Sequence, residues 1–301
     1  MLAIGGSVVC GKFLGEGNVP AASEIFSRIL YTSFAVSILI VVISLVFLDV
    51  IIRALGANDE LFPLVHSYMF IILCAAPLLI MGFTMDFFVR VDGRPVLAAV
   101  ALVFFAVTNI FLNWIFIVRW DWGLSGAAWA TAIAEFGIFV ILISHLFHPK
   151  CNLRLVRVAN RWKDGWDKVG RAAWNGFSEF ANEISIAVIT LLFNWVMITR
   201  LGVSGVAAFT IISYLLMVGI ETCYGFSDSL NPTVSKNLGA RNPKRIRLFT
   251  LTAILSSLAV GVVVCALLIL IPETLISIFL QEDEVETRAI ALSFIALFWP
   301  A

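Results

Sequence analysis

Two glutamates, Glu179 and Glu183, lie one helical turn apart inside the apolar stretch 177–199. Residues four apart face the same side of a helix, so the two carboxylates should be neighbours. In a low dielectric both cannot be ionised without a cation beside them, because each charge disfavours the other. A proton- or sodium-coupled exchanger requires such a site, whose charge changes when the coupling ion binds. The pair is therefore a candidate coupling-ion site; the alternative is that one glutamate reaches the interface and pairs with Arg171 or a neighbour.

Three more acids lie within apolar stretches. Glu221 and Asp228 are seven residues apart, which is two helical turns, so they share one stripe of a helix and are further coupling-ion candidates. Glu135 follows a run of small residues that lets helices pack closely. It could line a cavity or only bond across that helix interface. An ionisable group at membrane depth is costly, which makes each of these acids a functional candidate.

Amides form a second polar pattern. Asn109 and Asn113 are again four residues apart in an otherwise apolar run, so their shared face should turn toward the protein rather than toward lipid. Asn194 lies in the same stretch as the glutamate pair. With Glu135, these three amides are the candidate residues of a substrate cavity.

Metal and enzyme chemistry are not indicated. The five cysteines are scattered without a CxxC pair, and His66, His145 and His148 are expected at the membrane interface because they lie near the ends of apolar runs. An intramembrane enzyme would need a constellation such as HExxH or a Ser/His pair at depth, and the sequence contains none. We therefore expect no enzymatic activity and no cofactor beyond a coupling ion, H⁺ or Na⁺.

Membrane-length runs must position these residues. The 301 residues are 61% hydrophobic and 13% charged, with a mean hydropathy of +1.00, which is far too apolar for a soluble protein. A helix needs about 20 residues to cross the hydrocarbon core, and seven nearly uncharged runs are that long: 29–48, 64–88, 96–118, 124–147, 177–199, 203–226 and 248–271. Residues 1–10 and 285–301 should belong to two further spans, so we expect a fragment. The net charge of zero argues against a nucleic-acid partner.

The basic residues predict the orientation. Of the 20 lysines and arginines, 16 fall on one side of the predicted membrane, and only Arg53, Arg119, Arg200 and Arg288 fall on the other. The positive-inside rule places the first side in the cytoplasm. We thus expect a multi-pass protein of the inner membrane, with the lipid bilayer as a partner.

One sequence element occurs twice in the chain. GKFLGEGN at 11–18 recurs as SKNLGARN at 235–242, and the same offset lays the apolar run 29–48 onto 253–272. Six spans separate the copies, so the repeat is parallel and indicates two lobes. We assign 1–149 to an N-lobe, 150–171 to a cytoplasmic linker and 172–301 to a C-lobe. The linker is either an interfacial helix with Trp162 and Trp166 at headgroup depth or an ordinary basic loop. Within the copies, Gly15 and Gly17, or Gly239, are expected to permit a tight turn between antiparallel helices. Lys12 and Lys236 are expected at helix C-termini, and Pro243 at the start of a helix.

The chain resembles the multidrug and toxic compound extrusion (MATE) family. The residues that carry the resemblance are GGSVVCGKFLGEGN (5–18), DGRPVLAAVALVFFAVTNIFLNWIFI (92–117), WGLSGAAWATAIAE (122–135), NGFSEFANEISIAVITLLFNW (175–195) and SLNPTVSKNLGARNPKRIR (229–247). The resemblance implies an all-α membrane protein of twelve helices in two six-helix lobes. In that register, the chain runs from the end of helix 2 to the start of helix 10.

The resemblance also implies a function. It predicts a monomeric antiporter that exports small lipophilic or cationic compounds by alternating access, driven by protons or sodium. The family commonly carries an Asn and, four residues later, an Asp on its fifth helix; the matching positions here are Asn109 and Asn113. The missing carboxylate shifts the coupling assignment to the acids of helices 7 and 8.

Two alternatives stay open. A flippase for lipid-linked saccharides belongs to the same superfamily, but it should hold pyrophosphate with basic residues in its cavity, and no Lys or Arg lies near the middle of a predicted span. A chain that lacks helices of both lobes is, alternatively, a non-transporting fragment.

Overall fold

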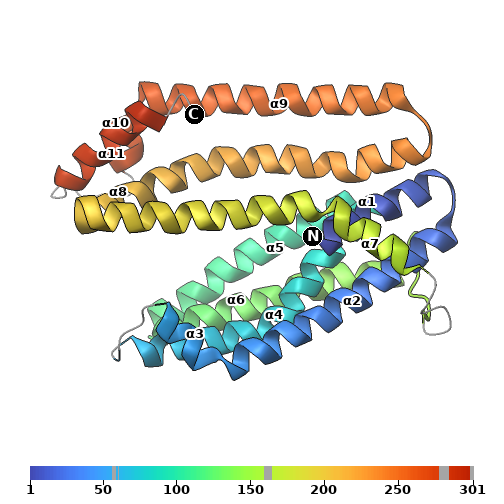
Figure 1. The fold of residues 1–301 in the computed structure, drawn as a ribbon, viewed down its shortest axis with the longest axis horizontal. Coiled ribbons are helices and arrows are strands. Elements are labelled where there is room, and N and C mark those ends of the chain that lie inside the picture. Colours follow the sequence, from blue (N-terminus) through green and yellow to red (C-terminus); the bar gives the residue numbers. More distant parts are fainter. Residues whose placement is uncertain (56–58, 60, 159–164, 278–284, 299–301) are drawn as a thin grey trace. The chain divides into compact units, whose positions relative to one another are not determined.

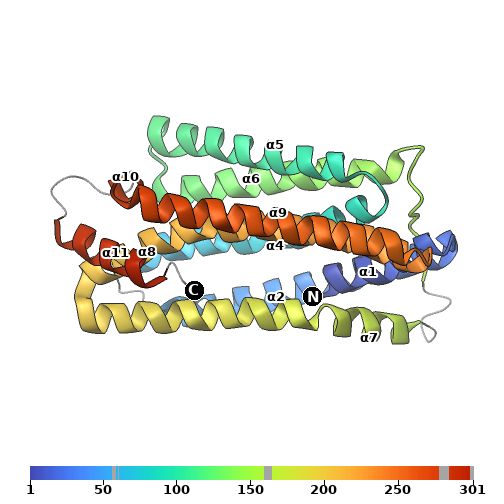
Figure 2. The same cartoon turned by 90° about the horizontal axis from the view of Figure 1, so that it is seen from above.

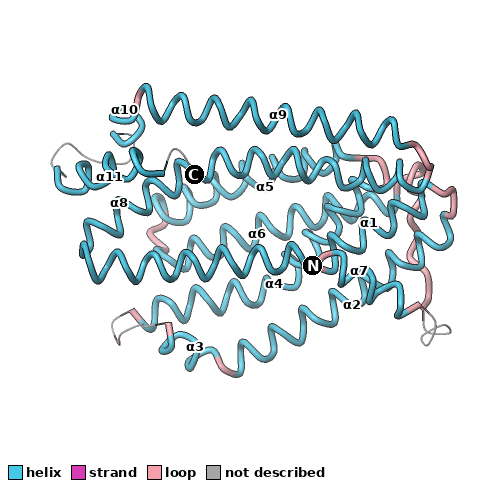
Figure 3. Tube along the Cα trace, turned by 45° about the horizontal axis from the view of Figure 1, so that its top comes forward, coloured by secondary structure: helices cyan, strands magenta, loops and turns pink. Residues whose placement is uncertain are grey.

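The computed structural model describes the chain except for residues 56–58, 60, 159–164, 278–284 and 299–301. Its described residues form helices and no strand (Figure 1), which confirms the all-α prediction. Most connections between the helices are short, and the long one lies between η2 and α7 (Figure 3). The elements in order are α1 (Leu2–Gly15), α2 (Val19–Val46), α3 (Leu48–Ala54), α4 (Phe62–Val91), α5 (Pro95–Asn113), the π-helix η1 (Trp114–Arg119), α6 (Gly123–Ile143), the 3₁₀-helix η2 (Ser144–Phe147), α7 (Trp166–Asn175), α8 (Phe177–Gly239), α9 (Pro243–Leu270), α10 (Pro272–Ser277) and α11 (Val285–Phe298).

Seven helices of the described chain are long and apolar enough to cross a membrane, as predicted. They are Val19–Val46, Phe62–Val91, Pro95–Arg119, Gly123–Phe147, Phe177–Gly202, Gly205–Gly239 and Pro243–Leu270. The two spans of α8 meet at Gly202, whose positive φ of 65° breaks the helix. A glycine adopts this left-handed conformation without the steric cost that a side chain would bring.

The chain divides into two compact units. Unit 1 contains residues 1–177 and 235–241, and unit 2 contains residues 178–234 and 242–301. The predicted lobe boundaries at 149 and 172 stay a prediction, but two details bear on them. The described part of the linker and α7 belong to unit 1, and so does the end of α8. Trp166 begins α7, whereas Trp162 lies outside the described residues.

Unit 1 has a core where α1, α2 and α4 meet. Phe26 of α2 packs edge-on against Phe88 of α4 with ring centroids 4.9 Å apart, and both side chains are almost fully buried. Ile25, Ile29 and Met85 complete the contact. Further along α2, large apolar side chains are exposed, as expected for a helix surrounded by lipid on its outer face. Figure 2 shows α2 and α4 from above.

The duplicated element has the same local structure in both copies. Asn18 accepts a hydrogen bond from the Ala21 amide at 3.1 Å, and Asn242 accepts one from the Arg245 amide at 3.2 Å, so each copy caps the next helix. The residues just before these caps, Gly17 (φ 76°) and Arg241 (φ 53°), turn the chain.

Part of the expected turn chemistry is therefore wrong. Gly15 and Gly239 are helical residues that do not turn the chain; their backbones instead lie against the other copy of the element. Lys12 and Lys236 occupy the last turns of α1 and α8, and Pro243 opens α9, as predicted.

The linker is strapped to unit 1 through its backbone. Residues 151–158 are not helical, so their amides need other acceptors. The Arg154 amide donates to Ser23 Oγ at 3.1 Å, and the Val156 amide donates to Ser27 Oγ at 2.8 Å. Both serines are buried on α2. Two α2 hydroxyls one turn apart thus hold residues 151–158, called the strap below, in an extended conformation.

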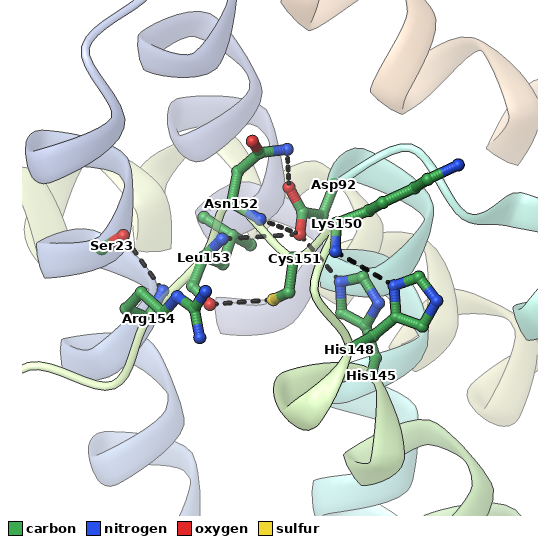
Figure 4. Close-up of polar contacts among 9 residues, drawn as sticks. All are labelled: Ser23, Asp92, His145, His148, Lys150, Cys151, Asn152, Leu153 and Arg154. Atoms are coloured by element: carbon green, nitrogen blue, oxygen red, sulfur yellow. Dashed lines mark hydrogen bonds and ion pairs between the residues drawn. The ribbon is translucent and has the colours of Figure 1, made fainter.

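Asp92, the residue after α4, anchors the start of the strap (Figure 4). Its Oδ2 accepts from the Asn152 amide at 2.9 Å and its Oδ1 from Asn152 Nδ2 at 2.8 Å. His145 Nε2 lies 2.8 Å from the same Oδ2. Burial opposes ionisation of Asp92, but the hydrogen bonds from His145, Asn152 and Cys151 outweigh it and hold the pKa of this carboxyl below its usual value.

We expect Asp92→Ala to release the strap, because the amides of Asn152 and Leu153 lose their shared acceptor. Trypsin should then cut after the exposed Arg154 and Arg157 roughly tenfold faster, since local opening that becomes easier by about 1.4 kcal/mol multiplies the open population by ten. The measurement is the rate of cleavage at these two sites in the purified protein.

Asp49→Ala is the matched control, because Asp49 is an exposed acid that lies 3.5 Å from His66. Equal cleavage rates in the Asp92→Ala variant and the wild type would show that Asp92 does not hold the strap. The anchoring is fully present above the ordinary carboxyl pKa and is lost as the pH falls through the lower pKa of folded Asp92.

Candidate functional site

The amide pair of α5 faces α6 within unit 1. Asn109 Nδ2 donates to Thr131 Oγ1 at 3.1 Å, and Asn113 Nδ2 donates to Asn109 Oδ1 at 3.0 Å. Thr131 in turn donates to the Ala127 carbonyl in its own helix. The three side chains form a hydrogen-bonded row across the α5–α6 contact, which is the inward orientation expected of them.

This row ends in an unused acceptor. Asn113 Oδ1 is buried and has no hydrogen-bond partner among the described residues. Glu135 follows Thr131 by one turn of α6, is half-buried, and has no partner in the described part of unit 1. The carboxylate can accept a proton, and the carboxylate and the amide oxygen can both coordinate a cation.

In unit 2, one hydrogen bond joins the two spans of α8. Asn182 Nδ2 donates to the Tyr224 hydroxyl at 2.6 Å. Phe193 and Phe209 stack with centroids 5.3 Å apart and hold the same two spans together nearer Gly202. The Asn182–Tyr224 bond therefore marks where polar groups of both spans converge.

The four predicted coupling acids differ in their position relative to this bond. Glu179 lies one turn before Asn182 and is half-buried, and Asp228 lies one turn after Tyr224 and is half-buried as well. Glu183 and Glu221 are exposed. All four acids lie within one turn of Asn182 or Tyr224, so burial alone distinguishes Glu179 and Asp228 from the other two, and the role of all four stays a prediction.

The alternative partner of the glutamates is already engaged. Arg171 Nη2 lies 2.9 Å from Asp167 Oδ2 within α7. Within the described part of unit 2, Glu179 has no hydrogen-bond or ion-pair partner. Asn194, the remaining cavity candidate, is half-buried in the same span.

A groove of about 560 Å³ runs between α8 and α9 of unit 2. Tyr224 lines it together with several small residues: Gly219, Cys223, Ser257, Gly261 and Cys265. Most of its lining is apolar, so it can accept a flat lipophilic molecule close to the Asn182–Tyr224 bond.

The only described group of metal-ligand types is Asp92, His145 and Cys151, whose ligand atoms lie within 4.8 Å of one another. Asp92 accepts the bonds described above, and the Cys151 thiol donates to the Leu153 carbonyl at 2.9 Å, whereas His145 Nδ1 has no partner among the described residues. Burial and the neighbouring Asp92 raise the pKa of Cys151 to about 11, which keeps the thiol protonated. These bonds make the group a structural anchor rather than an open metal site.

Sequence reasoning missed this anchor. His145 was expected at the membrane interface, but its side chain is only 1% exposed and lies against Asp92. The available indication was an aspartate directly after a span, in the segment DGRP at 92–95, which begins a turn. Its partners come from residues more than 50 positions away, which spacing alone does not reveal.

Comparison with known proteins places the chain in a family. The family model MatE matches residues 1–115 and 180–301. An FAD transporter of Shewanella oneidensis is 26% identical over 256 residues, which are 81% of this chain and 54% of that protein. The multidrug export protein MepA of Staphylococcus aureus is 22% identical over 294 residues, which are 96% of this chain and 63% of MepA.

Solved structures show the same fold. A MOP superfamily transporter from Pyrococcus furiosus matches with a TM-score of 0.86 at 22% identity, over 98% of this chain and 65% of that one. A multidrug resistance MATE family transporter in an outward-facing conformation matches with a TM-score of 0.85 at 22% identity, with the same coverage. The chain thus spans less than two thirds of the length of these relatives. Because the MatE model matches most of its residues, the chain belongs to the MatE family.

Proposed function

We propose that this chain belongs to a cation-coupled exporter of small lipophilic or cationic compounds. The observation that carries the proposal is the presence of half-buried carboxylates, Glu135 and Glu179, that have no partner among the described residues of membrane-length helices. A carboxyl group in such a position is stable either in its protonated, neutral form or as a carboxylate with a cation beside it. Membership of the MatE family supports transport as the use of this property.

The coupling ion, H⁺ or Na⁺, would bind among the acids of α8. Glu179 and Asp228 flank the Asn182–Tyr224 bond by one turn on either span, so neutralising them changes the charge at the point where the spans meet. The cation then stabilises one arrangement of the spans more than the other, which is the differential affinity that coupling requires. Alternating access by a protein whose basic loops face the cytoplasm would convert this preference into export.

The groove between α8 and α9 supports a lipophilic substrate. It is apolar and bordered by Tyr224, whose ring can contact a flat cation through its face. One relative is named a multidrug export protein, which supports a substrate of this kind. The absence of Lys and Arg from the middle of the spans argues against an anionic pyrophosphate substrate and so against the flippase alternative.

Replacing the half-buried acids should uncouple export. In the full-length protein reconstituted in vesicles, we expect Glu179→Gln and Asp228→Asn each to reduce ethidium efflux under an imposed proton or sodium gradient by roughly tenfold, the size of a typical coupling energy. Comparing the two gradients identifies the ion.

Glu221→Gln and Glu183→Gln are matched controls, because these glutamates lie on the same spans with exposed side chains. Gradient-driven efflux that survives both Glu179→Gln and Asp228→Asn would contradict the assignment, and equal losses in all four variants would contradict the special position of the half-buried pair.

Tyr224→Phe should weaken the contact between the two spans of α8, because it removes the hydroxyl that accepts a hydrogen bond from Asn182 and leaves the ring in place. Interhelical hydrogen bonds in membranes contribute about 0.6–1.7 kcal/mol, so a lower temperature of thermal unfolding in detergent is expected. Tyr31→Phe is the control, since Tyr31 is 45% exposed on the outer face of α2. An unchanged unfolding temperature in Tyr224→Phe would show that the Asn182–Tyr224 hydrogen bond does not hold the two spans together.

A further inference from the structure

The two copies of the repeated element cross each other inside unit 1. Each copy carries two small residues four apart, Gly11 and Gly15 at the end of α1, and Ser235 and Gly239 at the end of α8. A side chain added at Gly15 would overlap the Lys236 carbonyl oxygen, and one added at Gly239 would overlap the Lys12 carbonyl oxygen. Two helices that present small residues in this spacing bring their backbones into direct contact.

The contact is reciprocal. The position of a Cβ on Gly15 lies 3.0 Å from the Ala240 amide nitrogen, and that of a Cβ on Gly239 lies 3.0 Å from the Glu16 amide nitrogen. Residue pairs that exchange in this way are the mark of a two-fold axis, which here relates the two copies of the repeat. Any movement of one repeat relative to the other must therefore turn about this crossing or separate it.

A charge contact reinforces the crossing on one side. The Lys236 side chain extends from the end of α8 to the turn between α4 and α5. Its Nζ lies 3.8 Å from the position that a Cβ on Gly93 would occupy. There the Lys236 ammonium attracts the carboxylate of the neighbouring Asp92. Its repeat mate Lys12 is half-exposed, and its Nζ lies 4.0 Å from Glu16 in the same helix. The attraction to Asp92 thus connects the end of α8 to the residue that anchors the linker strap.

We propose that this crossing is the gate that closes the transport pathway at the basic end of the helices, with Lys236 and Asp92 as its electrostatic latch. The inference rests on the proposed alternating-access function. Backbone-to-backbone contact suits a gate, because it excludes water along its length yet has no interlocked side chains to withdraw when it separates. The single Lys236–Asp92 attraction then biases the closed state and can be released without unfolding a helix.

Spin labels at Glu16 and Ala240, both exposed beside the crossing, test the gate in the full-length protein reconstituted in nanodiscs. We expect the wild type to show a short and a long label-to-label distance whose ratio changes with pH or with sodium. Gly15→Ala and Gly239→Ala should deplete the short distance, because the methyl group cannot fit against the opposing carbonyl. Lys236→Gln should do the same without added bulk.

Gly225→Ala is the matched control, because Gly225 lies in the same helix with open space around its Cα. A single short distance in the wild type under every condition that supports efflux would overturn the gate and make the crossing a fixed joint. Equal shifts in Gly225→Ala would overturn it as well. Label distances that respond to the ion while no variant or wild type exports any compound would refute the proposed function and leave the gate standing.

Discussion

The structure depends on one constraint: a backbone that crosses hydrocarbon must satisfy its own amides and carbonyls. The seven membrane-length helices meet this constraint by their internal hydrogen bonds. Where the chain leaves a helix, side chains accept the hydrogen bonds of backbone amides that no longer have a partner within the helix. Asn18 and Asn242 cap the helices that follow the two copies of the repeat, and Ser23, Ser27 and Asp92 accept the amides of the linker.

The same constraint explains why the polar groups within the spans are informative. Asn109, Asn113 and Thr131 satisfy one another across the α5–α6 contact, and Asn182 finds Tyr224 across the two spans of α8. Glu135 and Glu179 find no such partner among the described residues. Lipid tolerates an uncompensated carboxylate poorly, so these groups carry the functional argument, whereas the bonded amides hold helices together.

The repeat shows how one sequence element can serve two structural purposes. Its asparagine caps the following helix in each copy, and its small residues bring the two copies together. The lysines of the two copies are no longer equivalent: Lys236 interacts with Asp92, while Lys12 lies by Glu16 at the surface. Duplication has kept the backbone contact and let the charges around it diverge.

Hydropathy alone was sufficient to predict the all-α class and the seven spans, because a run of about 20 apolar residues has few alternatives to a membrane helix. Spacing was also sufficient to put Asn109 and Asn113 on one inward face. Three features needed the tertiary structure. They are the buried contact of His145 with Asp92, the bond between Asn182 and Tyr224, and the crossing of Gly15 with Gly239 in place of the expected turn. Each joins residues between 42 and 224 positions apart. Local periodicity determines which face a residue occupies, but only the packing of distant helices decides what that face meets.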